Sequence, residues 1–190
     1  MNHRAEGHVS RRAFLGTLAG LAAISAAPAF ANTPAVLTGA GDIRRLRLTS
    51  RRTGESIDTV YWVEGHYVTE ALEELSFFMR DWRQNAIIDF DPQAFDVMAA
   101  TQQLLETSEP FNVLSGYRTA STNAMLRRRS RGVARNSYHM RGMAADLRMQ
   151  SRSANQVYHA AASVNGGGVG RYGRSGFVHV DSGPVRTWRR

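Results

Sequence analysis

The chain has 190 residues, a length suited to one domain, and a formal net charge of +8. It contains no cysteine, which excludes disulfides, thiolate zinc sites, cysteine nucleophiles and lipid-modified cysteine. All 24 basic side chains are arginine, so anionic partners have to be considered.

The N-terminus has the pattern of an export signal. Arg11 and Arg12 precede an apolar run over residues 14–27, and Ala29-Phe30-Ala31 places small residues where a signal peptidase cleaves. We expect residues 1–31 to be a twin-arginine signal peptide that delivers the folded protein to the periplasm or cell envelope. The alternative is an uncleaved anchor, but a membrane span needs about 20 residues and the apolar run is shorter.

A short linker and a β-hairpin are predicted next. Residues 32–42 are small and polar, and we interpret them as the linker to a domain over residues 43–190. The β-rich segments 43–49 and 57–63 flank a turn at Gly54, which predicts two paired antiparallel strands.

Two helices follow the hairpin. Apolar residues recur at helical spacing from Val68 to Trp82, with Thr69 as a candidate N-cap. The second helix is predicted to begin near Pro92, which suits a first turn, and to end near Glu106.

The C-terminal half alternates strands and helices without a regular βαβ repeat, which predicts an α+β fold with a small antiparallel sheet flanked by helices. The expected elements are strands over 111–117 and 143–149, helices over 122–129 and 153–163, a glycine-rich turn region over 166–176 and a final strand over 176–181.

The motif with the most chemical content lies between Ser137 and Asp146. It contains His139 and Asp146, and a second histidine, His179, returns near the C-terminus. Two imidazoles and one carboxylate form a ligand set that catalytic zinc uses, with a further position left for water. The non-haem iron oxygenases also bind their metal through two histidines and a carboxylate. In those enzymes, however, the His-x-Asp pair comes before the distant histidine in the sequence. Here the pair His179-Val180-Asp181 comes last.

The residues Ser137, His139, Gly142, Ala144 and Asp146 resemble the S-x-H-x-x-G-x-A-x-D signature of the zinc D-alanyl-D-alanine peptidases. The segments 115–118, 167–170 and 177–188 are similar, more narrowly, to the exported murein endopeptidases of that superfamily. The resemblance covers roughly residues 42–188 and implies a Hedgehog/D-Ala-D-Ala peptidase-like fold.

The resemblance also implies roles for individual residues. Arg118, which follows Ser115-Gly116-Tyr117, is expected to contact substrate and stabilise developing charge, and Ser137 to help bind the peptide. A surface arginine and a turn-forming hydroxyl are the plainer alternatives. Many relatives have a glutamate as general base three residues before the last histidine, where this chain has Gly176. Asp181 is the nearest candidate for that base, although it could instead orient a neighbouring side chain.

Two other motifs have competing interpretations. The basic run over 127–131 could bind nucleic acid or an anionic envelope polymer, but a solvated helix face is commoner, so we expect no nucleic-acid partner. Residues 168–173 match G-x-G-x-x-G, but no helix is predicted after them, so we interpret these glycines as a tight turn beside the site.

Together these features predict a monomeric zinc metallopeptidase that hydrolyses stems or cross-links of peptidoglycan without a membrane span after signal removal. The alternative is a non-catalytic, zinc-containing module that binds the cell wall.

Overall fold

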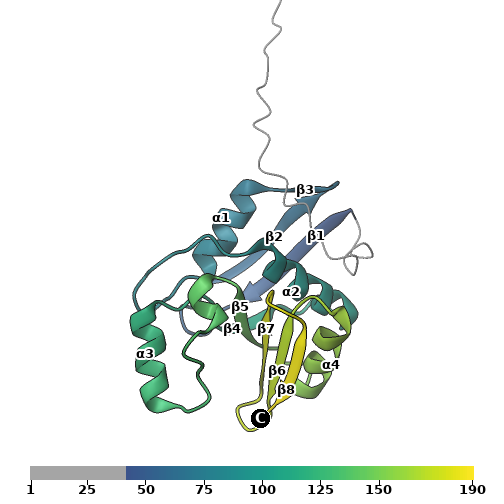
Figure 1. The fold of residues 1–190 in the computed structure, drawn as a ribbon. Coiled ribbons are helices and arrows are strands. Elements are labelled where there is room, and N and C mark those ends of the chain that lie inside the picture. Colours follow the sequence, from purple (N-terminus) through teal and green to yellow (C-terminus); the bar gives the residue numbers. More distant parts are fainter. Residues whose placement is uncertain (1–41) are drawn as a thin grey trace, which may run out of the picture. The chain divides into compact units, whose positions relative to one another are not determined.

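The computed structural model describes residues 42–190 (Figure 1). The expected signal peptide and the linker up to residue 41 lie outside the described residues. Among the described residues, no helix is both long and apolar enough to cross a membrane.

The described strands form one eight-stranded sheet in the order β3-β2-β1-β4-β5-β7-β6-β8. Their bounds are β1 (Ile43–Thr49), β2 (Ser56–Val63), β3 (His66–Tyr67), β4 (Phe111–Ser115), β5 (Ala144–Arg148), β6 (Gly168–Tyr172), β7 (Phe177–Asp181) and β8 (Arg186–Arg189). Most neighbours are antiparallel, but β1 with β4 and β6 with β8 are parallel pairs. The α+β prediction is confirmed, and the sheet is larger than the small antiparallel one expected.

Within residues 42–190, four α-helices and a short 3₁₀ helix accompany the sheet: α1 (Thr69–Phe78), α2 (Pro92–Leu104), α3 (Ala120–Arg129), α4 (Ala154–Val164) and the 3₁₀ helix η2 (Tyr138–Arg141). Three of the α-helices begin with a side-chain cap. Asp91 accepts from the Gln93 N–H, Thr119 from Thr122 and Ser153 from Gln156, and each cap satisfies one of the N–H groups that a helix start leaves free.

The first helix is shorter than predicted. It ends at Phe78, so Trp82 lies beyond it, and its N-cap is Val68 rather than Thr69, without a side-chain cap. The Met79 carbonyl accepts from the Tyr117 N–H at 2.7 Å, so a contact from a distant segment replaces the next helical turn. Periodicity alone does not reveal such a contact.

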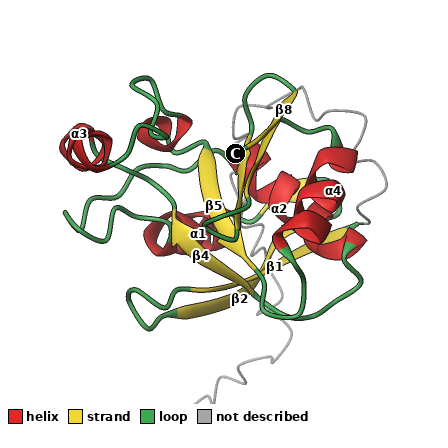
Figure 2. Cartoon of the chain, turned by 90° about the horizontal axis from the view of Figure 1, so that it is seen from below, coloured by secondary structure: helices red, strands yellow, loops and turns green. Residues whose placement is uncertain are grey.

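Two of the helices cover one side of the sheet. Helices α2 and α4 pack against each other and both contact β7, while α4 also covers β6. Figure 2 shows them together on one side of the sheet, with α3 on the opposite side. The fully buried side chains of Phe95, Leu147 and Val180 belong to the core that these helices close. The other face of β5 to β8 is left for the site.

The glycine-rich segment differs most from its predicted structure. Gly168 and Gly170 lie inside strand β6 rather than in a tight turn, and the turn comes later, between β6 and β7. Strand β8 was not predicted. It pairs in parallel with β6, with Gly170 opposite Trp188 and Gly168 opposite Arg186.

Candidate metal centre

Three elements bring the candidate ligands together. Asp146 on β5 and His179 on β7 are direct cross-strand partners, so their side chains leave the same face of the sheet. His139 lies on η2, and the residue that caps the C-terminus of η2, Gly142, has the left-handed conformation, with φ of 66°. At Gly142 a Cβ atom would come within 2.9 Å of the Ile88 side chain, so both the conformation and the space require glycine.

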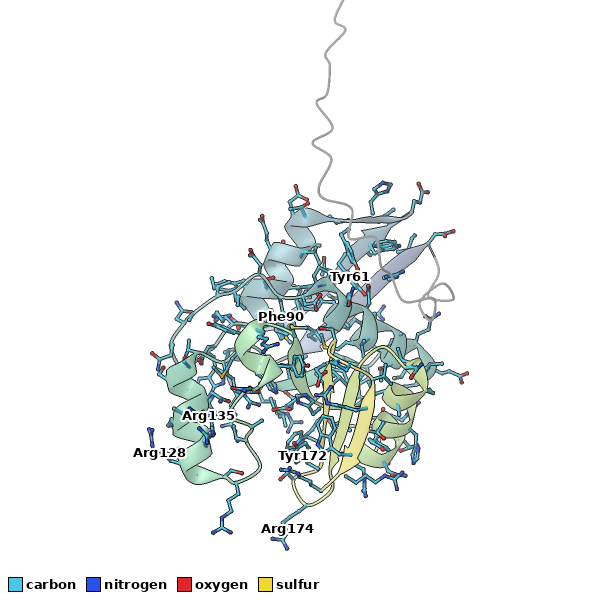
Figure 3. All side chains as sticks on the ribbon, viewed as in Figure 1. Tyr61, Phe90, Arg128, Arg135, Tyr172 and Arg174 are labelled. Carbon is cyan, nitrogen blue, oxygen red and sulfur yellow. The ribbon has the colours of Figure 1, made fainter. Side chains whose placement is uncertain are left out.

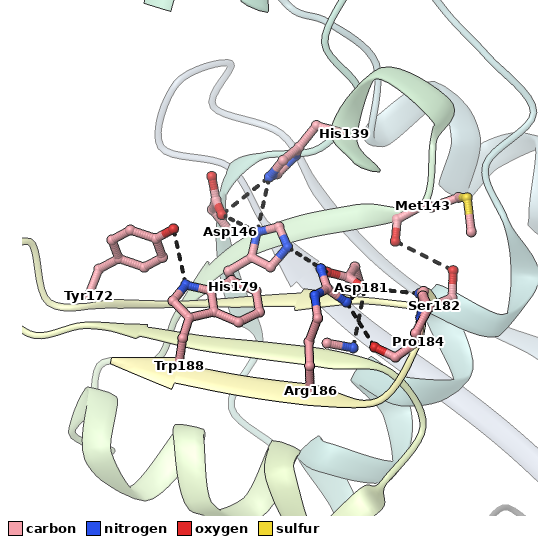
Figure 4. Close-up of polar contacts among 12 residues, drawn as sticks. His139, Met143, Asp146, Tyr172, His179, Asp181, Ser182, Pro184, Arg186 and Trp188 are labelled. Carbon is pink, nitrogen blue, oxygen red and sulfur yellow. Dashed lines mark hydrogen bonds and ion pairs between the residues drawn. The ribbon is translucent and has the colours of Figure 1, made fainter. Parts of the chain in front are cut away.

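The candidate ligand atoms have the spacing of a zinc site. His139 Nε2 lies 3.2 Å from His179 Nδ1 and 3.3 Å from Asp146 Oδ1, and His179 Nδ1 lies 3.0 Å from Asp146 Oδ1. Zinc bonds of about 2.0–2.1 Å in tetrahedral geometry separate neighbouring ligand atoms by about 3.3–3.4 Å. Among the described residues, this is the one group of three histidine or acidic side chains close enough to hold an ion. The donor set therefore fits zinc (Figure 4).

The second nitrogen of each histidine fixes its tautomer. His139 Nδ1–H donates to the Gly116 carbonyl at 2.7 Å, which leaves Nε2 as the lone-pair atom. His179 Nε2–H donates to Asp181 Oδ2 at 2.9 Å, which leaves Nδ1. Outer partners of this kind are typical of histidines that bind metals, because they orient the ring and raise its basicity.

Electrostatics keep Asp146 charged and His139 neutral. Burial opposes ionisation of Asp146, but hydrogen bonds with His139 and His179 and the positive charge of Arg118 hold its pKa well below the usual value. Burial lowers the pKa of His139. A carboxylate and a neutral imidazole are the forms that bind a metal ion.

Arg118 lies at the floor of the site. Its Nη2 donates to Asp146 Oδ2 at 2.5 Å, and its Nε donates to Ser115 Oγ at 2.8 Å. The pairing occupies Oδ2 and leaves Oδ1 of Asp146 facing the histidines. Arg118 is buried, which disagrees with the interpretation of a simple surface arginine.

Asp181 lies behind His179 rather than in front of the ligand atoms. It is completely buried, and Oδ2 accepts from His179 Nε2 and Arg186 Nη2. Oδ1 accepts from the N–H groups of Gly168 and Gly183 and from Arg186 Nη1. Burial raises the pKa of Asp181, but the bonds from His179 and Arg186 lower it to about 2. Its placement suits an orienting carboxylate better than the proton acceptor suggested by strand alternation.

Ser137 and Gly176 complete the residues selected from sequence. Ser137 is buried at the N-terminus of η2, lines the cleft and makes no side-chain cap. Gly176 occupies the β6–β7 turn with φ of 64°, and no atom lies near the place of a Cβ. The position at which the family resemblance leads us to expect a glutamate is therefore part of a left-handed turn in this chain, where glycine is favoured.

The three ligand atoms open into a cleft of about 280 Å³. One wall is the loop from Ser130 to Tyr138, and the other is formed by side chains of β6, β7, β8 and the β6–β7 turn. Figure 3 shows Tyr172 and Arg174 on the sheet side and Arg128 and Arg135 on the α3 side. Among the described residues that line this cleft, Asp146 is the one carboxylate.

Sequence reasoning missed the cleft residues of β8. The cross-strand pairs place His179, Gly170 and Trp188 in one row across β7, β6 and β8. Because Gly170 has no side chain, the Trp188 ring lies over it and approaches the His179 ring, with centroids 5.3 Å apart. A Cβ at Gly170 would come within 2.2 Å of the Trp188 ring. The G-x-G spacing was the available signal, and it was attributed to a turn.

Comparison with known proteins identifies the family of this chain. The profile of the peptidoglycan L,D-endopeptidase MepK family matches residues 38–188. The chain belongs to this family. Peptidoglycan L,D-endopeptidase MepK of Escherichia coli K12 is 44% identical over 176 residues, which cover 92% of this chain and 93% of that protein. A probable MepK of Haemophilus influenzae is 42% identical over 147 residues, covering 77% and 79% of the two chains. The resemblance to zinc D-alanyl-D-alanine peptidases is thereby confirmed, and the chain is a hydrolase of the MepK family.

Proposed function

We propose that this protein is a zinc-dependent L,D-endopeptidase that cleaves peptide cross-links of peptidoglycan in the cell envelope. The observation that supports this proposal most is the trio of His139, Asp146 and His179, whose ligand atoms lie 3.0–3.3 Å apart at the floor of an open cleft. The names of the MepK relatives supply the class of bond.

Zinc bound by these residues would supply a Lewis acid for the scissile carbonyl and would lower the pKa of water to about 7. The protein contributes orientation. The Gly116 carbonyl and Asp181 hold the two imidazoles in the required tautomers, and Arg118 holds Asp146. Because all three ligands are preset by other groups, little rearrangement is needed when the ion binds.

Arg118 has a second role in the proposal. Its guanidinium lies within 2.9 Å of His139 Nε2, so it is adjacent to the position where the substrate carbonyl has to approach. A fixed cation at that position stabilises the negative charge that develops on the carbonyl oxygen during hydrolysis. Ser137, on the loop side of the cleft, is proposed to bind the peptide backbone.

Asp181 is proposed to orient His179 instead of accepting a proton from water. All five donors around its carboxylate come from the protein, and the residue has no exposed surface from which to reach substrate. Its interaction with His179 has the form of the carboxylate–histidine pairs that support zinc ligands.

The charge distribution supports an anionic polymer as the partner. After Glu109 the chain has 14 arginines and two acidic residues, Asp146 and Asp181, both in the site. Residues 42–109 have seven arginines and 13 acidic residues. Both walls of the cleft belong to the basic half, so the field of the protein attracts anions toward the cleft.

The proposal includes export by the twin-arginine route, with cleavage after Ala31. Replacement of Arg11 and Arg12 by lysine is expected to stop export, and N-terminal sequencing of the exported protein is expected to begin at Asn32. Continued export of the variant, or a mature N-terminus far from Asn32, contradicts this part of the proposal.

The non-catalytic wall-binding module considered from the sequence disagrees with membership of a hydrolase family, and one assay separates it directly from the enzyme. The deciding experiment incubates purified residues 32–190 with isolated peptidoglycan and measures new amino groups. Release that stops with a chelator and returns with zinc supports the enzyme. Binding to peptidoglycan without release, in zinc-loaded protein, supports the module.

A further inference from the structure

Arg186 differs from the other cleft residues because Asp181 fixes its position while part of its hydrogen-bonding capacity remains unused. It lies on β8 in the row that contains Asp181 and Gly168, next to the row of His179 and Trp188. A Cβ at Gly168 would come within 2.1 Å of Arg186, so glycine makes room for the guanidinium to reach Asp181. Its side chain is 39% exposed and lines the cleft.

The hydrogen bonds of Arg186 leave one edge of the guanidinium free. Nη1 donates to Asp181 Oδ1 and to the Pro184 carbonyl, both at 2.9 Å, and Nη2 donates once, to Asp181 Oδ2 at 2.7 Å. A guanidinium has five N–H donors. Among the described residues, the second N–H of Nη2 and the N–H of Nε have no acceptor. These two donors lie side by side and match the two oxygens of a carboxylate.

Two aromatic rings hold this guanidinium in place. Its carbon lies 5.0 Å from the centroid of the Tyr138 ring and 5.1 Å from that of Trp188, which come from opposite walls of the cleft. With Asp181 hydrogen-bonded to one edge and two aromatic rings within about 5 Å, the side chain has little freedom left to lose when a ligand binds. A donor fixed in this way binds its acceptor with a smaller entropic cost.

We propose that Arg186 is a carboxylate-binding subsite, and that it recognises a free α-carboxylate on the residue that supplies the scissile nitrogen. The proposal rests on the proposed peptidase function and adds a substrate determinant to it. Rows of one sheet face are two residues apart, so Arg186 is displaced by about 7 Å along the strands from the row that contains His179. In a peptide, the α-carboxylate oxygens of the residue after the scissile bond lie about 4–5 Å from the scissile carbonyl carbon. A hydrogen bond of about 3 Å covers the remaining distance.

The subsite also has consequences for the direction of binding. A carboxylate at Arg186 places the amine-bearing half of the substrate toward Tyr138 and Trp188, and the acyl half toward the β6–β7 turn. For an endopeptidase, a residue with a free α-carboxylate must continue into the second peptide through its side chain. The subsite therefore selects branched cross-links over linear peptides that continue through the α-carboxyl group.

The test uses two synthetic branched peptides that share an L,D bond and differ at one group. The D-residue carries either a free α-carboxylate or an α-carboxamide, and its side chain carries the second peptide. Hydrogen bonds to a charged group are worth about 1.5–3 kcal/mol, so wild-type kcat/KM is expected to favour the carboxylate by about 10- to 100-fold, mostly through KM. Arg186→Lys, which keeps a cation beside Asp181 but lacks the fork, is expected to reduce this preference to less than about threefold.

A preference ratio separates recognition from support of the zinc site. If Arg186 only steadied Asp181, then Arg186→Lys would lower activity on both peptides equally and leave the ratio unchanged. The matched control is Arg189→Gln, on the same strand, whose guanidinium lies over the Tyr158 ring, outside the cleft lining. Its ratio is expected to equal that of the wild type.

Three results overturn the proposal. Equal cleavage of both peptides by the wild type removes the subsite while the peptidase function stands. An unchanged ratio in Arg186→Lys assigns the preference to another residue. Cleavage of neither peptide by zinc-loaded wild type contradicts the peptidase function itself, and the subsite with it.

Discussion

Replacement of Asp181 by asparagine separates the two roles that this residue could have. The substitution keeps the shape of the side chain but turns one oxygen into an NH₂ donor. In the protein, Oδ2 of Asp181 accepts two hydrogen bonds and Oδ1 accepts three. Whichever oxygen becomes the amide NH₂, that group then faces at least two N–H donors that have lost their acceptor. Each buried donor left without an acceptor costs about 1–3 kcal/mol. We expect a loss of about 3 kcal/mol in the free energy of unfolding.

The effect on the metal site follows from the tautomer of His179. With an amide NH₂ beside Nε2, the favourable arrangement moves the imidazole proton to Nδ1, and Nδ1 is the atom that faces Asp146 and His139. A protonated Nδ1 has no lone pair for a metal. Loss of an outer partner of this kind typically reduces metal affinity by about 10- to 100-fold, and we expect that range.

The assay is a competition for zinc between the protein and a chromophoric chelator, combined with turnover at saturating zinc. Asp58→Asn is the matched control, because Asp58 also pairs with arginines, Arg45 and Arg47, but is exposed and outside the cleft lining. Its zinc affinity is expected to equal that of the wild type. An Asp181→Asn variant that binds zinc normally but turns over about 100-fold more slowly would refute the orienting role and restore Asp181 as the proton acceptor.

Four further predictions follow from the same geometry. Purified His139→Ala and His179→Ala are each expected to contain almost no zinc by elemental analysis, and stoichiometric zinc in either variant contradicts the ligand assignment. Gly170→Ala is expected to lower the free energy of unfolding in urea by about 1–3 kcal/mol and to lower turnover, because a Cβ would meet the Trp188 ring at 2.2 Å. The control is Gly173→Ala, where the atom nearest to a Cβ is 3.4 Å away, and its stability should stay within about 0.5 kcal/mol of the wild type. Equal stability of these two variants speaks against the packing role of Gly170. Arg118→Lys is expected to reduce turnover at least tenfold more than zinc affinity, since lysine keeps the charge but lacks the fork; the opposite pattern makes Arg118 a metal-site support alone. Finally, raising the salt concentration from 50 to 200 mM is expected to slow cleavage of intact peptidoglycan several-fold and to leave hydrolysis of a small uncharged peptide nearly unchanged. If salt slows cleavage of both substrates equally, the result argues against electrostatic attraction to the cleft.

The candidate metal ligands could be selected from sequence because the motif is local. His139, Gly142 and Asp146 lie within one short stretch, and two imidazoles with a carboxylate are a ligand set that predicts a metal site. His179, the cross-strand partner of Asp146, lies in a second segment, at residues 177–181, that could also be recognised from sequence. The first hairpin, with its initial strand at Ile43, and the capped helix beginning at Pro92 were likewise set by nearby residues.

The residues that sequence did not reveal act through strand pairing at long range. Arg186 and Trp188 reach the site because β8 joins β6 in parallel and because Gly168 and Gly170 leave the space between them empty. Neither condition is visible in a single sequence, where the same glycines equally favour a turn. The end of α1 at Phe78 was missed for a similar reason, since the Met79 carbonyl bonds to the distant Tyr117.

The role of Asp181 shows where strand alternation ceases to be informative. Alternation correctly places Asp181 on the same face as His179, and the two side chains are hydrogen-bonded. It does not say on which side of the imidazole the carboxylate lies. That depends on Arg186 and on the N–H groups of Gly168 and Gly183, which hold Asp181 away from the cleft.

The central claim is that one zinc ion, held by His139, Asp146 and His179, makes this cleft a peptidase of L,D bonds in peptidoglycan. The most direct test is a titration of metal-free protein with zinc while the products released from purified peptidoglycan are identified by mass spectrometry. The account predicts no release without metal, a rise that levels off at about one zinc per chain, and products that arise from cleavage between an L- and a D-configured centre. Full release by metal-free protein, or none from protein that has bound one zinc at these residues, would contradict it.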